Sequence, residues 1–389
     1  MSADRATPLR RTPLMRPLPH PLTLVAALAC ARPGKLPAGD SPSDSPASEI
    51  PAADPTILRG ARALVLDPAL GLEEGAAVDL QIEGGRLTAI AASGALTGAE
   101  VVDLSGAWIV PAFIDSHVHL AYRPDAEGMA DGGVAGAVDM AAPIAFLSAD
   151  HAPLVVKAAG PMVTATGGYP TQSWGRDGYG LECADAEEAV AAVERLADLG
   201  ADLIKMPLTG SPELDDDAQA AVVAAAHARG LKVASHALDP ISVGNAATAG
   251  VDLLAHTPTA ELSAELSAAW SGKAVVSTLR AFGGSARAVA NLAALSAAGA
   301  TVLYGTDFGN TSTAGVDGSE LTLLEAAGLS GEAILRAGTS EPAFYWGFSD
   351  LGQLAVGRRA SLMVLDADPR AEPGALATPS AVYIDGSRR

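Results

Sequence analysis

Residues 111–122, PAFIDSHVHLAY, carry two histidines separated by one residue at the end of an apolar run. Residues 107–115, AWIVPAFID, are apolar, include β-branched side chains and lack helical periodicity, which predicts a short buried strand. Residues two apart in a strand point to the same side, so His117 and His119 can direct both imidazoles to one point. Neutral imidazole is the commonest protein ligand of metal ions. On this pair alone, a metal site and two polar residues at a strand–loop junction are equal alternatives.

Length and composition limit the class of protein. The chain has 389 residues, enough for one large domain and a smaller one, and 49% of them are hydrophobic, which supplies a sizeable core. The formal net charge is −20, from 45 acidic and 25 basic residues. That balance argues against nucleic acid as a partner, because nucleic-acid binding needs a concentrated basic surface. Two cysteines, Cys30 and Cys183, exclude a disulfide framework.

The N-terminal 55 residues are predicted to lie outside the folded part. Residues 1–30 read as a signal peptide, with a basic start, a short apolar run over residues 22–29 and a final ALAC. This ending resembles a bacterial lipobox, which implies lipidation of Cys30. Residues 31–55 are rich in Pro, Ser, Ala and Asp, as in a flexible linker. We expect a protein of the bacterial cell envelope, either lipid-anchored, with the anchor as its only membrane contact, or exported and soluble.

Two β-rich segments flank a longer region of alternating pattern. Residues 56–108 and 348–389 contain short apolar runs split by glycine-containing turns, and we predict that they form one small composite domain, a β-sandwich. Residues 109–347 alternate apolar strands with alanine-rich helices, an order that implies parallel strands and right-handed crossovers. Eight units predict an α/β fold of the (β/α)8 TIM-barrel type, in which functional residues lie at the carboxyl ends of the strands.

The expected strands and helices follow from this alternation. The strands are the one before His117 and residues 136–140, 162–166, 203–206, 232–236, 253–257, 274–279 and 302–307. The clearest helices cover residues 185–200, 215–230 and 286–299. Asp239, which precedes Pro240, matches a helix N-cap followed by proline at the first helical position.

Polar side chains stand at or near the ends of five of these strands. They are His117 and His119 (strand one), Lys205 (strand four), His236 (strand five), His256 (strand six) and Asp307 (strand eight). In a barrel, the carboxyl ends of parallel strands open at one face. We therefore expect all six side chains to meet at a single mouth.

The ordered motifs FIDSHVHL, GADLIKM, KVASHA, GVDLLAH and GTDFG resemble those of the amidohydrolase superfamily, and are most similar to its imidazolonepropionase-like and prolidase-like branch. The resemblance runs from about residue 57 to the C-terminus. It implies a first metal ion held by His117, His119 and Asp307, and a second held by His236 and His256. It also implies that Lys205 is carboxylated and bridges two divalent ions, for which zinc is the default, and that a bridging hydroxide completes the site.

The implied reaction is hydrolysis of a carbon–nitrogen bond in an amide or cyclic amide. A carbamate on Lys205 supplies two anionic oxygens, which an ammonium group lacks. Two close divalent ions lower the pKa of a shared water, and one of them can polarise the scissile carbonyl. Asp307 then serves as general acid and base, taking the proton of the attacking hydroxide and later protonating the leaving nitrogen. The alternatives are an ester or lactone hydrolase on the same metal site, and a non-catalytic solute-binding lipoprotein.

Substrate contacts are predicted from position along the chain. The loop after the third strand offers Tyr169, Trp174 and Arg176. Arg280 follows strand seven, where its guanidinium can bind a carboxylate through two hydrogen bonds. An N-acyl amino acid or a dipeptide is the expected small-molecule substrate, and a homo-oligomer is compatible with the sequence.

Overall fold

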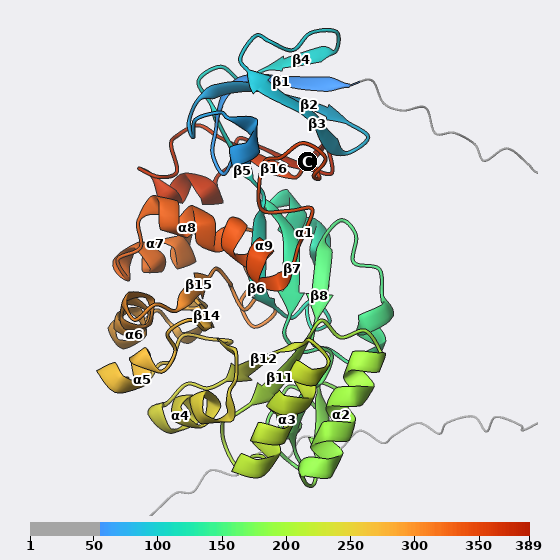
Figure 1. The fold of residues 1–389 in the computed structure, drawn as a ribbon, viewed down its shortest axis with the longest axis vertical. Helices are drawn as coiled ribbons and strands as arrows, with labels where there is room; N and C mark the ends of the chain where they lie inside the picture. The colour runs from blue at the N-terminus through green and yellow to red at the C-terminus, as the bar shows by residue number, and fades with distance from the viewer. Residues whose placement is uncertain (1–54) are drawn as a thin grey trace, which may run out of the picture. The chain divides into compact units, whose positions relative to one another are not determined.

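The computed structural model of the protein describes residues 55–389, which form a mixed α/β fold (Figure 1). The predicted signal peptide, the predicted linker up to residue 54 and Cys30 lie outside the described residues. Within residues 55–389, no helix is both long and apolar enough to cross a membrane.

Strands from both ends of the described chain share one eight-stranded sheet. Its members are β1 (Thr56–Ala63), β2 (Ala77–Glu83), β3 (Arg86–Ala92), β4 (Glu100–Asp103), β5 (Trp108–Pro111), β16 (Leu362–Leu365), β17 (Ala381–Ile384) and β18 (Ser387–Arg388). They follow the order β18-β17-β16-β5-β1-β2-β3, with β4 paired to β1. The N-terminal strands and β16 lie together at the top of Figure 1. A separate apolar core, which includes Leu58, Leu80 and Leu362, lies under this sheet.

The structure shows no explicit β-sandwich in these segments, because their strands belong to one hydrogen-bonded sheet. A sandwich consists of two sheets packed face to face. Here β5 pairs with β1 on one side and with β16 on the other, with Val110 opposite Met363. The N-terminal and C-terminal strands are thus joined edge to edge into one sheet.

The region between these segments contains parallel strands in three sheets, of order β6-β7-β8, β10-β9 and β11-β12-β13-β14-β15. Their bounds are β6 (Phe113–Val118), β7 (Val134–Asp139), β8 (Val155–Ala158), β9 (Met162–Ala165), β10 (Gly180–Cys183), β11 (Leu203–Pro207), β12 (Lys232–His236), β13 (Leu253–Leu254), β14 (Ala274–Val276) and β15 (Thr301–Leu303). Each predicted strand of the alternating region overlaps an observed one. Strands β8 and β10 were not predicted, because each is four residues long and carries a charged residue, Lys157 in β8 and Glu182 in β10.

The helices of the described chain are α1 (Ala126–Asp131), α2 (Ala186–Asp198), α3 (Asp216–Ala228), α4 (Pro240–Ala249), α5 (Ala264–Ala268), α6 (Ala286–Ala297), α7 (Gly318–Ala326), α8 (Gly331–Gly338) and α9 (Ser340–Trp346). Helices α1 to α8 begin at residues whose side chains cap them, whereas α9 has no side-chain cap. The three predicted helices correspond to α2, α3 and α6. Asp239 caps α4 as predicted, because its carboxylate accepts hydrogen bonds from the backbone N–H groups of Ile241 and Ser242 at 2.9 and 3.1 Å.

Backbone hydrogen bonds join β6 to the segment that follows β15. The N–H of Ser116 donates to the carbonyl of Tyr304 at 2.9 Å, and the N–H of Asp307 donates to the carbonyl of His117 at 2.8 Å. The N–H of His119 donates to the carbonyl of Phe308 at 2.7 Å. These bonds hold the two histidines of the first parallel strand beside the aspartate that follows the last one.

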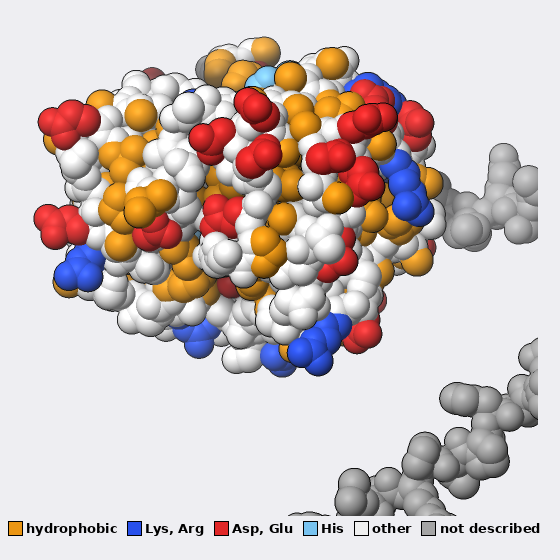
Figure 2. Space-filling model, turned by 90° about the horizontal axis from the view of Figure 1, so that it is seen from below, with side chains coloured by type: hydrophobic (Ala, Val, Ile, Leu, Met, Phe, Trp, Pro, Cys, Tyr) orange, Lys and Arg blue, Asp and Glu red, His pale blue; other side chains and the backbone are white. Residues whose placement is uncertain are grey.

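Charged side chains are dispersed over the surface. Figure 2 shows one face of the molecule, on which acidic side chains stand singly or in small groups among uncharged and hydrophobic ones. Basic side chains on this face lie mainly toward its margin and do not gather into one patch. The acidic side chains on this face therefore form no single large patch.

Candidate metal centre

One cavity of about 260 Å³ is lined by all six polar residues that the sequence places at strand ends. They are His117, His119, Lys205, His236, His256 and Asp307. His117 lies in β6 and His119 directly follows it, Lys205 lies in β11, His236 ends β12, and His256 and Asp307 follow β13 and β15. All six are at most 8% exposed, so their polar atoms face the cavity and one another rather than bulk water.

Three of these side chains bring their ligand atoms within contact of one another. The Nε2 atoms of His117 and His119 are 3.3 Å apart. Oδ1 of Asp307 lies 3.2 Å from Nε2 of His119 and 3.6 Å from Nε2 of His117. The three residues form a group that could hold a metal ion.

The hydrogen bonds of the other ring nitrogens define how these imidazoles are protonated. Nδ1 of His117 lies 2.7 Å from the carbonyl oxygen of Ala255, and Nδ1 of His119 lies 3.4 Å from that of Ala141. A carbonyl only accepts, so Nδ1 carries the proton, and Nε2 of a neutral ring presents its lone pair to the cavity. Nδ1 of His256 is held by the hydroxyl of Thr278 at 3.1 Å. Carbonyl and hydroxyl partners of this kind orient metal-binding histidines in proteins generally.

Burial favours the neutral form of His117, His236 and His256. Desolvation lowers the pKa of His117 and of His256 well below the ordinary value of 6.5, with smaller contributions from neighbouring positive groups. The same cause lowers the pKa of His236 to about 3. Neutral imidazoles are the form that binds metal ions.

The donor set fits a metal ion. Two lone pairs and a carboxylate oxygen face one point at separations of 3.2 to 3.6 Å, which is repulsive without a cation between them. A tetrahedral ion with ligand bonds of about 2.0–2.1 Å spaces its ligand atoms about 3.3 Å apart. The observed separations match that spacing.

Lys205 is a buried amine without a partner. Its side chain is fully buried, and Nζ has no hydrogen-bond partner among the described residues. Desolvation lowers its pKa to about 7, which favours the neutral amine. A buried polar atom of this kind normally has a partner, so the orphaned Nζ is itself a sign that a group is missing from the site.

His236 and His256 line the same cavity as the triad. The ring of His256 lies 4.3 Å from that of His117 and 4.6 Å from that of His236, centroid to centroid. They do not belong to the compact group formed by the triad. Two imidazoles are an incomplete ligand set for an ion, so a second ion at these rings needs further donors.

The backbone around Asp307 is unusual. Asp307 has a φ of +55°, which a non-glycine residue seldom adopts, and Nδ2 of Asn310 donates to its Oδ1 at 3.0 Å. At Gly309, with a φ of +112°, an added Cβ would lie 2.8 Å from Cβ of His119. Strained backbone is often found at functional sites, where surrounding contacts maintain it.

The four predicted substrate contacts lie in different places, and Tyr169 and Trp174 are the two that line the cavity. Tyr169 lines the cavity, and its hydroxyl accepts a hydrogen bond from Nε1 of Trp174 at 2.8 Å. Arg176 is outside the lining and donates to the carbonyl of Gln172 at 3.2 Å. Arg280 is also outside the lining, and its guanidinium pairs with the carboxylate of Asp317.

The lining includes residues that sequence reasoning missed. They are Met162, Ala281, Phe282 and Asn310. Asn310 stands three residues after Asp307 in GTDFGN, so a short polar side chain close to a predicted ligand was the available signal. The other three are common apolar residues, and nothing in the sequence separates them from core positions.

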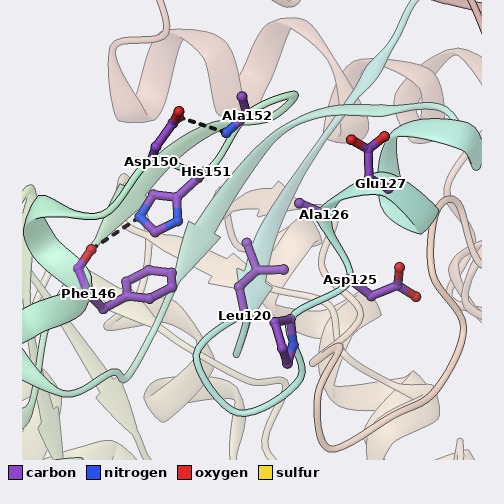
Figure 3. Close-up of a pocket in the computed structure, with 9 residues that line it drawn as sticks. Leu120, Asp125, Ala126, Glu127, Phe146, Asp150, His151 and Ala152 are labelled. Carbon is purple, nitrogen blue, oxygen red and sulfur yellow. Dashed lines mark hydrogen bonds between the residues drawn. The ribbon is translucent and has the colours of Figure 1, made fainter.

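A second hollow, of about 240 Å³, lies beyond the loop that follows His119 (Figure 3). Its polar side chains have local partners. Asp150 accepts from the N–H of Ala152 at 3.0 Å, and Nε2 of His151 lies 3.1 Å from the carbonyl of Phe146. Asp125 caps α1 and Glu127 pairs with Arg389. The cavity with the six strand-end residues therefore remains the candidate site.

Comparisons with known proteins place the chain in a family. The amidohydrolase family matches residues 108–388, more than two thirds of the chain. An uncharacterised protein of Mycobacterium tuberculosis (strain ATCC 25618 / H37Rv) and one of Mycobacterium bovis are each 26% identical over 376 residues, which cover 82% of this chain and 93% of the relative.

Solved structures of hydrolases share the fold. A Xaa-Pro dipeptidase with bound methionine has a TM-score of 0.72 at 20% identity, covering 86% of this chain and 99% of that one. Phenylurea hydrolase B has a TM-score of 0.69 at 18% identity, covering 86% and 96%. Ochratoxinase of A. niger has a TM-score of 0.68 at 17% identity, covering 87% and 96%. The family match over the region that carries the cavity shows that the chain belongs to the amidohydrolase family and is a hydrolase of carbon–nitrogen bonds.

Proposed function

We propose that the protein is a metal-dependent amidohydrolase whose cavity holds two divalent ions. The observation that carries this proposal is the convergence of two imidazole lone pairs and the Asp307 carboxylate at separations of 3.2 to 3.6 Å. His117, His119 and Asp307 would hold the first ion. Zinc suits such a set of nitrogen and carboxylate ligands, although manganese, iron and cobalt also accept them.

The second ion would be held by His236 and His256. Carboxylation of Lys205 would supply the missing donors, because a carbamate places two anionic oxygens between the two pairs of histidines. The buried, unpaired Nζ and its lowered pKa support this modification, since a neutral amine reacts with carbon dioxide and an ammonium does not. Arginine could not replace it, because a guanidinium does not form this group.

The residues of the chain have separate tasks in this reaction. When bound, the ions would acidify a water molecule and polarise the scissile carbonyl. Asp307 would accept the proton of the attacking water and deliver it to the leaving nitrogen. Asn310 would hold the Asp307 carboxylate through its hydrogen bond of 3.0 Å. The buried histidines would keep their lone pairs directed inward through the contacts of Nδ1.

The finer architecture is part of the same proposal. The eight predicted strands, which correspond to β6, β7, β9 and β11 to β15, would close into a (β/α)8 barrel, supported by the backbone hydrogen bonds between β6 and the segment after β15. Residues 109–347 would form this barrel, and residues 56–108 and 348–389 the flanking domain. The predicted leader would place the enzyme in the cell envelope, anchored through a lipid on Cys30.

Two rival functions use the same cavity. An ester or lactone hydrolase would need the same ligands. A solute-binding lipoprotein would bind without turnover, and it has no use for a carboxylate positioned beside imidazole lone pairs. Replacing Asp307 with Asn separates the second rival, because turnover should vanish while substrate binding persists.

Metal content is the first test of the proposal. Elemental mass spectrometry of the purified protein should find about two ions per chain, and Lys205→Ala should lower this number even after incubation with bicarbonate. Lys232→Ala is the matched control, because Lys232 begins β12 at the end of the strand opposite His236. A single ion that is unaffected by Lys205→Ala would contradict the bridged pair.

A further inference from the structure

We infer that the enzyme acts on uncharged amide-type substrates that present an aromatic ring beside the scissile bond, and not on dipeptides or N-acyl amino acids with a free carboxylate. The inference rests on the proposed function and goes beyond it by naming the substrate class. Its basis is the part of the cavity wall that does not belong to the proposed ligand set.

Three aromatic residues that line the cavity each contact a different histidine of the site. The ring of Trp174 lies 5.2 Å from that of His119, Tyr169 lies 5.1 Å from His236, and Phe282 lies 4.9 Å from His256, all between centroids. Met162 and Ala281 line the cavity as well. Rings at centroid distances of about 4.5–7 Å make favourable offset or edge-to-face contacts, so this wall suits a flat apolar group of a substrate.

The wall offers no cation for a substrate carboxylate. Among the described residues that line the cavity, Lys205 is the one basic side chain other than the histidines, and it belongs to the proposed ligand set. Arg280 is engaged by Asp317 and by the hydroxyl of Thr313 at 2.8 Å. A substrate carboxylate bound at this wall would be desolvated without gaining a charged partner, which is energetically unfavourable.

One polar group of the wall suits a neutral substrate. The hydroxyl oxygen of Tyr169 accepts the hydrogen bond of Trp174, so its own O–H remains available to donate. A phenol donor is matched by the carbonyl oxygen of an amide, a carbamate or a urea.

The reaction balances as a simple hydrolysis. The carbon–nitrogen bond breaks, and a carbon–oxygen bond forms to the oxygen of water. One proton of that water passes through Asp307 to the leaving nitrogen. An N-aryl amide thus yields a carboxylic acid and an aromatic amine, and no oxidant or other co-reactant is needed.

A matched pair of probes isolates the charge. The metal-loaded protein is assayed with 4-acetamidobenzamide and with 4-acetamidobenzoate, which differ in one carboxylate, and with the dipeptide glycylproline. Release of acetate or of free proline is followed by chromatography. We expect kcat/KM for the neutral probe to exceed that for either carboxylated compound by roughly tenfold or more, because the charged group has no partner in the cavity.

A variant tests the aromatic wall. Phe282→Leu should raise KM for N-phenylacetamide about three- to tenfold and leave that for N-cyclohexylacetamide within about twofold, since only the former gains a ring–ring contact. Metal content should not change. Phe344→Leu is the control, because Phe344 is 90% exposed on α9 and lies outside the cavity lining.

The results of these assays distinguish failure of the substrate inference from failure of the proposed function. A higher kcat/KM for glycylproline or 4-acetamidobenzoate overturns the inference and leaves the proposed hydrolase in place. Equal losses for both acetamides in Phe282→Leu also overturn it. Metal-loaded protein that cleaves none of the probes overturns the inference and counts against amide hydrolysis as well. Protein that binds no metal contradicts the proposed function itself.

Discussion

Asp307 combines a rare backbone conformation with three separate contacts. Its N–H donates to the carbonyl of His117, its Oδ1 faces Nε2 of His119, and Asn310 donates to the same oxygen. A φ of +55° costs free energy, so these contacts are what maintain the conformation. The position of the proposed proton carrier is thus defined by neighbours on both strand β6 and the loop after β15.

Removing Asn310 tests this support. Asn310→Ala should lower kcat about 10- to 100-fold, because a hydrogen bond to a charged group contributes roughly 1.5–3 kcal/mol. KM and metal content should change little, since Asn310→Ala leaves His117, His119 and the Asp307 carboxylate in place and removes only one hydrogen bond to that carboxylate. Steady-state kinetics with a neutral amide, together with metal analysis, gives the answer.

A control variant and a negative result complete that test. Asn245→Ala removes an asparagine on α4 that does not line the cavity, and it should keep the parent kcat. An unchanged kcat in Asn310→Ala would mean that the other contacts of Asp307 suffice. Loss of metal would instead make Asn310 part of the ion-binding structure.

Buried carboxylates join elements whose loops carry the site. Glu320 on α7 accepts hydrogen bonds from the N–H groups of Leu279 and Arg280, at 2.9 and 2.7 Å, and so fixes the turn that bears Phe282. Asp139 at the end of β7 accepts from the N–H of Leu120 at 2.7 Å, next to His119. These hydrogen bonds fix the positions of two loops that lie outside the regular strand pairing.

The free energy of unfolding should depend on pH through the buried Glu320 side chain. Burial raises the pKa of Glu320 from 4.5 to about 7, so the folded state binds this proton more tightly than the unfolded chain does. This contribution to the free energy of unfolding is fully present below about pH 4.5 and is lost as the pH rises through about 7. Glu320→Gln removes this pH-dependent contribution. The difference in the free energy of unfolding between the variant and the parent should therefore change by roughly 3 kcal/mol across that pH window.

Urea unfolding between about pH 5 and pH 8 measures that difference. Glu325→Gln is the control, because Glu325 is an exposed carboxylate on the same helix and its variant should follow the parent curve. Parallel curves for Glu320→Gln and the parent would show that the buried carboxylate titrates normally.

The whole molecule should depend on its ions for part of its stability. The cavity holds converging acceptor atoms in the folded chain alone, so ions bind the folded state and shift the unfolding equilibrium. At free ion concentrations about 1,000-fold above Kd, binding adds about 4 kcal/mol. A chelator should therefore lower the unfolding temperature, and added zinc should restore it, as measured by calorimetry.

Two variants make this result specific. His117→Ala should show a smaller chelator-induced shift in unfolding temperature than the parent, because it removes a ligand of the first proposed ion. His227→Ala should respond like the parent protein, because His227 lies on α3 and pairs with Asp252 on the surface. A chelator response that is undiminished in His117→Ala would assign the ions to another part of the molecule.

Local sequence was enough to predict the strand ends and the helix starts. The six polar residues follow apolar runs, and Asp239 precedes a proline, so each signal lies within a few residues of its consequence. Strand alternation then implied that these ends share one side, and the structure brings all six into one cavity. The metal and catalytic roles that the sequence assigned to them remain predictions.

Tertiary structure alone decided the features that depend on distant partners. Arg280 was expected to meet a substrate, but its guanidinium pairs with Asp317, 37 residues further along the chain. The pairing of β5 with β16 joins the N-terminal and C-terminal flanking strands into one sheet. These two strands lie far apart in the described chain, so local sequence did not predict their pairing. Propensity and capping act between neighbours in sequence, whereas side-chain direction and sheet pairing are selected by groups that only the folded chain brings together.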